Sequence, residues 1–268
     1  MSKLSFLKIN FIDKAAFGFK LFCFIFLTLK LIFLKVLVQM VSKKLAIKLV
    51  QLFHKLVLWF INIDVEVTGE DYSHKVATLY VSNHLSYIDI PILGSLINAK
   101  FIAKAEISSW PFIGFLSRIG NTIFINRNLK FLKKNKTIIF EQMSKGENLI
   151  LFPEGTTSDG IRVLNFKSSL FSSLENRNIM IQPIVIYYKS VNGIPLNRWL
   201  KPIIAWYGDM DLKPHLINIF KLISIKAKVI FLPPINGKNF NDRKDMTYIL
   251  HHAIDNFYSN ELNKTLLK

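Results

Sequence analysis

The sequence predicts an α/β fold in which helices cover a mostly parallel β-sheet, with membrane-associated helices at its amino terminus. From residue 62 onward, short apolar runs typical of strands alternate with helical segments, which is the pattern of such a sheet. Before residue 61, long apolar stretches carry lysines at intervals. We therefore expect a membrane-associated helical segment over residues 1–60 and one α/β domain over residues 61–268.

The charge and the apolar content together favour a membrane surface as a partner. The chain has 35 Lys and Arg against 18 Asp and Glu, a formal net charge of +17, and 51% hydrophobic residues. A basic chain of ordinary polarity would suggest nucleic acid, whereas a basic chain this apolar suits an anionic membrane better. Because coding bias also enriches lysine, isoleucine and phenylalanine, no prediction rests on composition alone.

The single cysteine, Cys23, excludes an intramolecular disulfide and a cysteine-based metal cluster, which fits a reducing compartment. It lies inside an apolar run, so we do not expect it to act as a nucleophile. Near the carboxyl end, His251 and His252 have no cysteine or carboxylate at ligand spacing, so no metal site is expected there.

Residues 17–41 form an apolar stretch long enough to span a bilayer, but Lys20, Lys30 and Lys35 interrupt it, and its longest uncharged run is 21–29. A lysine near the centre of a span costs about 2.5–3.5 kcal/mol on insertion scales. We predict a helix that lies in the membrane plane or is half inserted, with a true span and a soluble core helix as alternatives. The absence of a small-residue cleavage site disfavours a signal peptide.

Residues 43–60 predict an amphipathic helix because polar and apolar residues recur at three- and four-residue spacing on opposite faces. The basic polar face favours a membrane surface, and packing on the domain's own sheet is the alternative. The polar positions are Lys44, Lys48, Gln51 and Lys55, and the apolar ones are Leu45, Leu49, Phe53, Leu56 and Val57. A further helix is expected over residues 241–265, at the end of the chain.

The expected strands occupy residues 62–68, 76–82, 101–104, 121–126, 148–152, 180–188, 202–207 and 226–232. Chemically informative residues stand where four of them end. In a parallel sheet the carboxyl ends of the strands share one edge, where ligands bind, so these residues should converge. They are His84, Lys104, Arg127 and the turn residues Glu154, Gly155 and Thr156.

His84 and Asp89 are the candidate catalytic pair. Two residues five positions apart within one helix point about 140° away from each other, so they meet only if the histidine precedes the helix and the aspartate lies on its first turn. Ser86, three residues before Asp89, predicts a helix capped at that point. A carboxylate that holds an imidazole makes it a general base. The alternative is that Asp89 only caps the helix and His84 is a surface residue.

Four blocks in order carry a family resemblance, namely residues 83–89 (NHLSYID), 120–127 (GNTIFINR), 152–156 (FPEGT) and 181–185 (IQPIV). They resemble the motifs of the glycerolipid acyltransferases, the lysophosphatidic acid acyltransferase-like family. Asn126, where the second block usually has an acidic residue, leaves the arginine intact. Thr157, where many members have arginine, leaves the acceptor more open.

The resemblance implies that His84, oriented by Asp89, deprotonates a hydroxyl that attacks an acyl thioester directly, without a cofactor, a metal or an acyl-enzyme. Arg127, with Lys104 as a weaker candidate, would hold an acidic head group, and Glu154, Gly155 and Thr156 would contribute to acceptor binding. The donor would be acyl-CoA or acyl carrier protein.

The expected acceptor is 1-acyl-glycerol-3-phosphate, giving phosphatidate. Residues 206–215 resemble a subset of the family that acts on lyso-ornithine lipids, which makes another lysolipid the alternative. The expected location is the cytosolic face of the cell's inner membrane. A non-catalytic basic module that binds lipid or nucleic acid is the remote alternative, but it leaves the four blocks unexplained, so we expect no nucleic-acid partner.

Overall fold

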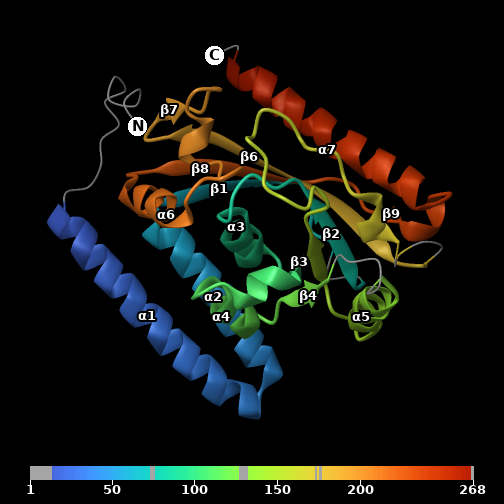
Figure 1. Cartoon of the computed structure of the whole chain (residues 1–268), viewed down its shortest axis with the longest axis horizontal. Helices are drawn as coiled ribbons and strands as arrows, with labels where there is room; N and C mark the ends of the chain where they lie inside the picture. The colour runs from blue at the N-terminus through green and yellow to red at the C-terminus, as the bar shows by residue number, and fades with distance from the viewer. Residues whose placement is uncertain (1–13, 73–75, 127–131, 173, 175–176, 267–268) are drawn as a thin grey trace.

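The computed structural model describes residues 14–72, 76–126, 132–172, 174 and 177–266. At its centre is a nine-stranded sheet of order β1-β8-β6-β2-β5-β3-β4, and β7 and β9 pair with β6 (Figure 1). The strands are β1 (Ile63–Thr68), β2 (Thr78–Ser82), β3 (Lys100–Lys104), β4 (Ile123–Ile125), β5 (Leu149–Leu151), β6 (Met180–Val191), β7 (Ile194–Pro195), β8 (Ile225–Phe231) and β9 (Ile235–Asn236).

Most of this sheet is parallel, which confirms the predicted fold class. Strands β6, β2, β5, β3 and β4 run parallel to one another, so their carboxyl ends lie at one edge. Strand β8 is antiparallel to β6, and β1 is parallel to β8. The four strands expected to carry functional residues all belong to the parallel part.

The strand predicted over residues 202–207 is wrong. The chain there forms a short 3₁₀ helix, η5 (Lys201–Ile203), followed by an irregular segment. Pro202 lacks a backbone N–H, which weakens any strand. The buried ammonium of Lys201 donates to the Gly160 carbonyl, as does the hydroxyl of Tyr258. These contacts hold the segment against the loop that follows β5.

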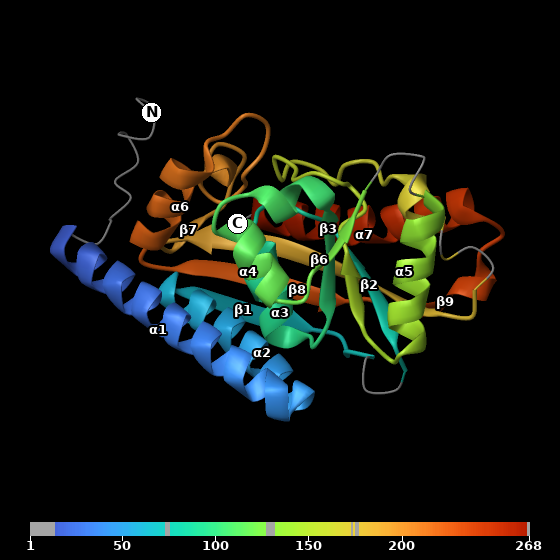
Figure 2. The same cartoon turned by 60° about the horizontal axis from the view of Figure 1, so that its bottom comes forward.

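Helices cover both faces of the sheet. Helix α7 lies along one face, and α2 and α3 lie on the other, as Figures 1 and 2 both show. The helices are α1 (Lys14–Val41), α2 (Lys43–Phe60), α3 (Asp89–Leu96), α4 (Ile113–Ile119), α5 (Leu132–Ser144), α6 (Leu212–Lys221) and α7 (Arg243–Leu266), with 3₁₀ turns η2 (Ala105–Ser109), η4 (Ser168–Phe171) and η6 (Gly237–Asn239).

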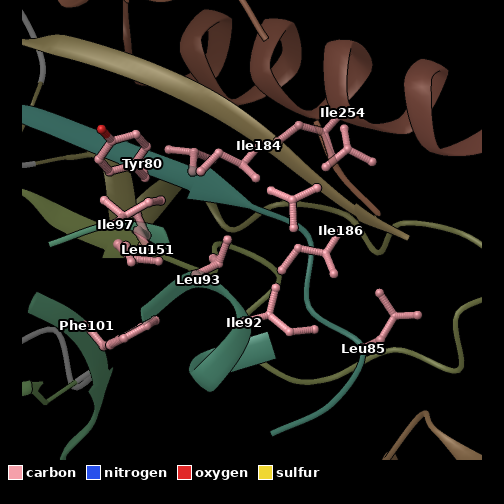
Figure 3. Close-up of a cluster of buried hydrophobic side chains, with 14 of the residues drawn as sticks. Tyr80, Leu85, Ile92, Leu93, Ile97, Phe101, Leu151, Ile184, Ile186 and Ile254 are labelled. Atoms are coloured by element: carbon pink, nitrogen blue, oxygen red, sulfur yellow. The ribbon is translucent and has the colours of Figure 1, made fainter. Parts of the chain in front are cut away.

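The core joins the strands that end at the functional edge to α3 and α7. Figure 3 shows Ile92 and Leu93 of α3 beside Leu151 of β5 and Ile184 of β6, with Ile254 of α7 near β6. All five side chains are buried. Burial of a side chain of this size stabilises the fold by about 1.5–3 kcal/mol, so the packing of these side chains holds the edge that carries His84 in place.

Helix α1 buries two of its polar residues and exposes a row of large apolar side chains. Thr28 and Lys35 are buried, and the ammonium of Lys20 donates to the Phe220 carbonyl of α6 at 3.0 Å. The outer face exposes Phe22 and Phe26, together with Phe19, Leu29, Phe33, Leu37 and Met40. The helix expected over residues 17–41 is therefore present, and Lys30 and Gln39 are exposed together with these apolar side chains.

Within the described residues, α1 is the helix that is long and apolar enough to cross a membrane. Helix α2 packs between α1 and α3 and still exposes Leu45, Leu52 and Trp59 beside Lys48 and Lys55. Its exposed face therefore mixes apolar and basic side chains, which is typical of a helix at a membrane interface.

Helix α2 contacts α3 through His54, whose ring lies against Gly94. A Cβ atom at Gly94 would stand 2.4 Å from Cδ2 and 2.6 Å from Nε2 of that ring. The His54 ring also packs edge-on against Phe101, with ring centroids 6.2 Å apart. Burial lowers the pKa of His54 to about 4, so the ring is neutral at physiological pH. Glycine at position 94 is thus what lets α2 approach α3.

We expect Gly94→Ala to lower the free energy of unfolding by about 1–3 kcal/mol, because the new methyl group must displace the packed His54 ring. The helix-forming advantage of alanine offsets part of this loss. Adding His54→Ala removes the clash, so thermal unfolding of the double variant in detergent should show less than the sum of the two single losses. Gly18→Ala in α1, where nothing lies within 4 Å of the new Cβ, is the control and should not destabilise. Strict additivity would contradict this packing argument.

Candidate active site

The ends of β2, β3 and β5 bring the predicted site residues to one edge of the sheet. His84 follows β2, Lys104 is the last residue of β3, and the turn from Pro153 to Thr156 follows β5. Arg127, which follows β4, lies outside the described residues. Strand β4 pairs with β3 in parallel register, in which Lys104 is the partner of Ile125.

His84 and Asp89 meet as a hydrogen-bonded pair. Nδ1 of His84 lies 2.8 Å from Oδ2 of Asp89. The aspartate is fully buried, while the imidazole retains 16% of its side-chain exposure. The same Oδ2 atom accepts the backbone N–H groups of Leu85 at 2.7 Å and Ser86 at 2.9 Å. The carboxylate is therefore fixed by the loop that carries the histidine, and one ring nitrogen stays near the surface.

The expected cap at Ser86 is replaced by a different device. Helix α3 begins at Asp89, Ile88 is its cap residue, and no side chain caps it. The Ser86 hydroxyl is buried without a hydrogen-bond partner within the described structure. Asp89 instead reaches back to the preceding N–H groups, as the second residue of a capping box does. His84 precedes the helix and Asp89 lies on its first turn, as predicted, whereas the predicted side-chain cap at Ser86 is wrong.

Asn83 and Phe152 hold the histidine loop, and sequence reasoning gave neither a role. The Asn83 amide donates to the Ile186 carbonyl at 2.9 Å and accepts the Ile186 N–H at 2.8 Å, so it extends the β2–β6 pairing by one more unit. The Phe152 ring stacks on the His84 imidazole, with centroids 4.0 Å apart and an interplanar angle of 14°. The sequence signal for these two residues is their position in the motifs. Asn83 directly precedes the motif histidine, and Phe152 stands two residues before the motif glutamate.

Glu154 is buried beneath the histidine loop and holds backbone groups. Its Oε1 accepts the His84 N–H at 2.7 Å, and its Oε2 accepts the Leu164 N–H at 2.9 Å. Burial raises the pKa of the Glu154 carboxyl to about 8, although both backbone donors act in the opposite direction. This carboxyl ties the loop after β2 to residue 164, and its 1% exposure keeps it from the surface.

The turn after β5 continues with a buried glycine and an exposed threonine. Gly155 has a φ of +73°, which an L-residue with a side chain adopts only with strain, so glycine is required by the turn itself. Thr156 is exposed, and Lys104 is half-buried. Among the described residues, no group of three or more His, Cys, Asp and Glu side chains is arranged to hold a metal ion.

Comparison with known proteins decides the family. A family model described as Acyltransferase matches residues 64–187. A lyso-ornithine lipid O-acyltransferase from Rhizobium meliloti is 31% identical over 218 residues, which cover 78% of this chain and 74% of that protein. The chain belongs to the acyltransferase family. The matched region of this acyltransferase contains His84, Asp89, Glu154 and the whole of the edge described above.

Other relatives agree. The lyso-ornithine lipid O-acyltransferase from Brucella abortus is 31% identical over 77% of this acyltransferase and 80% of its own length. A 1-acyl-sn-glycerol-3-phosphate acyltransferase from Neisseria gonorrhoeae is 30% identical over 68% and 70%. The crystal structure of the 1-acyl-sn-glycerophosphate acyltransferase PlsC from Thermotoga maritima covers 93% of this chain and 97% of its own, with a TM-score of 0.65 and 21% identity. That likeness confirms the fold, and the sequence relatives confirm the predicted family.

Proposed function

We propose that the protein is a lysolipid O-acyltransferase in which His84 and Asp89 activate the acceptor hydroxyl. The observation that carries this proposal is the 2.8 Å contact between Nδ1 of His84 and Oδ2 of a fully buried Asp89, at the sheet edge of a member of the acyltransferase family. The acyl donor is a thioester, either acyl-CoA or acyl carrier protein, and the product is a lipid with one more acyl chain.

The reaction follows from which nitrogen the aspartate holds. Because Nδ1–H donates to Asp89, the lone pair for proton removal is on Nε2. His84 takes the proton of the lipid hydroxyl as its oxygen attacks the thioester carbonyl carbon, and Asp89 stabilises the imidazolium that forms. When the tetrahedral intermediate collapses, the carbon–sulfur bond breaks and the leaving thiolate receives that proton. No covalent acyl-enzyme is required.

The remaining predicted residues take two kinds of role. We assign Arg127 and Lys104 to the acidic head group, since guanidinium and ammonium groups bind such anions. Gly155 and Thr156 belong to the turn after β5, in which Thr156 is exposed and suits acceptor contact, while the buried Gly155 supplies the conformation of the turn. Glu154 is reassigned from acceptor contact to positioning, because its two oxygens already accept the N–H groups of His84 and Leu164.

Two acceptors are candidates. Lysophosphatidate was expected from the motifs. Lyso-ornithine lipid is the second candidate because the relatives with that name from Rhizobium meliloti and Brucella abortus are as similar to this chain, at 31% identity, as the Neisseria gonorrhoeae 1-acyl-sn-glycerol-3-phosphate acyltransferase is, at 30%. The deciding experiment offers the purified full-length protein each lysolipid with each thioester donor. Acylation of one acceptor identifies the substrate, and failure with every lysolipid would refute the proposal.

The membrane is the proposed place of work, at the cytosolic face of the inner membrane. A lysolipid lies in the bilayer, whereas a CoA or carrier-protein thioester is in the cytosol, so the site must serve both. Helix α1 offers an outward row of aromatic side chains, and α2 adds Leu52 and Trp59 beside lysines. Residues 1–60 are therefore proposed as the membrane-associated segment and residues 61–268 as the catalytic domain.

We expect the apolar face of α1, more than the net charge, to hold the protein on lipid. Replacing Phe22, Phe26 and Phe33 with serine should weaken binding to anionic vesicles by about tenfold or more at both low and high salt, because buried apolar area contributes independently of salt. Co-sedimentation with vesicles measures this change. The control replaces the exposed Tyr248 and Phe257 of α7 with serine. Complete release of the unaltered protein by salt alone would contradict the prediction.

A further inference from the structure

The second oxygen of Asp89 has a partner from a distant strand. The hydroxyl of Tyr188, in β6, donates to Oδ1 of Asp89 at 2.6 Å. Both residues are buried, with the tyrosine 1% exposed and the aspartate fully enclosed. Successive residues of a strand point to opposite faces, and Tyr187 accordingly packs against Tyr258 of α7, with ring centroids 5.6 Å apart. Tyr188 thus has the orientation that reaches α3.

We propose that Tyr188 is a positioning residue that sets the proton affinity of the His84–Asp89 pair. This inference rests on the proposed function. A donor on Oδ1 spreads the negative charge of the carboxylate away from Oδ2, and it fixes the carboxylate plane so that Oδ2 meets Nδ1 of the imidazole. A hydrogen bond to the ionised form of an acid favours that form, so the aspartate remains an anion beside the histidine.

The tyrosine acts as a donor throughout the working pH range. Burial and then the charge of Asp89 raise the pKa of Tyr188 well above its usual value, so its hydroxyl keeps its proton. Other ionisable groups face this pair from each neighbouring element. They are Tyr87 in the loop before α3, Glu154 in the loop after β5 and Tyr258 in α7, and burial raises the pKa of each.

The experiment compares pH profiles of kcat/KM for the full-length protein on vesicles that contain the lysolipid. Tyr188→Phe removes the donor from Oδ1, so the carboxylate becomes more basic and the imidazolium beside it more stable. We expect the acidic limb of the profile to move up by about one pH unit, while the plateau at high pH changes only a few-fold. Because His84 and Asp89 titrate as a coupled pair, the acidic limb of the profile reports protonation of the pair and not of one residue alone.

The matched control is Tyr187→Phe, a buried neighbour that faces α7 and should leave the limb in place. A second variant carries 3-fluorotyrosine at position 188, whose more acidic hydroxyl is a stronger donor and should move the limb down. Opposite shifts for the two substitutions support the inference. Limbs that coincide with that of the unaltered protein overturn it, as does an equal shift in Tyr187→Phe.

The two proposals fail in different ways. If His84→Ala retained near-full activity, the general-base assignment itself would be lost, whatever the tyrosine variants did. If His84→Ala abolished activity and the Tyr188 substitutions left the limb unmoved, only the role of Tyr188 would be lost. Thermal unfolding of each variant in detergent accompanies the kinetics, and a lower midpoint without a moved limb also counts against the inference.

Discussion

His84→Ala should lower the rate of acyl transfer by about 10³-fold or more, while the protein remains folded. The imidazole has one face on Phe152 and retains 16% exposure, so its removal costs little packing. Among the described residues, the two neighbouring carboxyls are poor replacements for the imidazole, because Asp89 and Glu154 are buried and already accept backbone N–H groups. Initial rates at saturating acceptor and donor measure the loss.

His252→Ala serves as the control, because this exposed histidine of α7 is far along the chain from the site and should leave the rate unchanged. Equal binding of acceptor to the His84→Ala variant and the unaltered protein would place the loss in the chemical step. A variant that kept within tenfold of the original rate would show that some other group removes the proton.

Asp89→Asn should lower the rate by about 10²–10⁴-fold without disrupting the loop. The amide oxygen can still accept the N–H groups of Leu85 and Ser86, and the new NH₂ group can donate to the hydroxyl of Tyr188, since a tyrosine hydroxyl also accepts hydrogen bonds. What is lost is the negative charge that stabilises the imidazolium. The hydrogen bonds of this side chain are therefore retained, whereas proton transfer to His84 is impaired.

The measurement is kcat with the thermal unfolding midpoint determined in parallel. Asp64→Asn, at an exposed position of β1, is the matched control for loss of one carboxylate. A large drop in the midpoint of the Asp89 variant would mean that the carboxylate is needed mainly for folding. A small loss of rate with an unchanged midpoint would mean that the imidazolium needs no charged partner.

Much of the fold could be predicted because the spacing of apolar residues and the turn residues that end each element are local features of the sequence. The apolar runs of β2, β5 and β8 are short, rich in branched residues and followed by turns, so their positions were found within a few residues. The strand expected at 202–207 failed because its apolar residues serve a loop that is held by Lys201 and Gly160, a contact between distant parts of the chain. Likewise, the burial of Thr28 and Lys35 depends on the packing of α1 against α2 and α6.

The site divides in the same way. His84 and Asp89 were predicted because one motif places them five residues apart after a strand, and Glu154 was predicted because a second motif follows another strand. Tyr188 reaches Asp89 from 99 positions along the chain, and a tyrosine in an apolar strand resembles any core residue. The contact of His54 with Gly94 was hidden for the same reason, since only folding brings α2 against α3.

The position of β8 in the sheet determines when β1 gains its neighbouring strand during synthesis. Strand β1 pairs with β8, so Ile63 can pair with Ile225 only after residue 225 has been translated. Because translation proceeds from the amino terminus, α1 and α2 leave the ribosome long before β8 does. The two helices that expose apolar side chains are therefore made before the sheet that β8 completes.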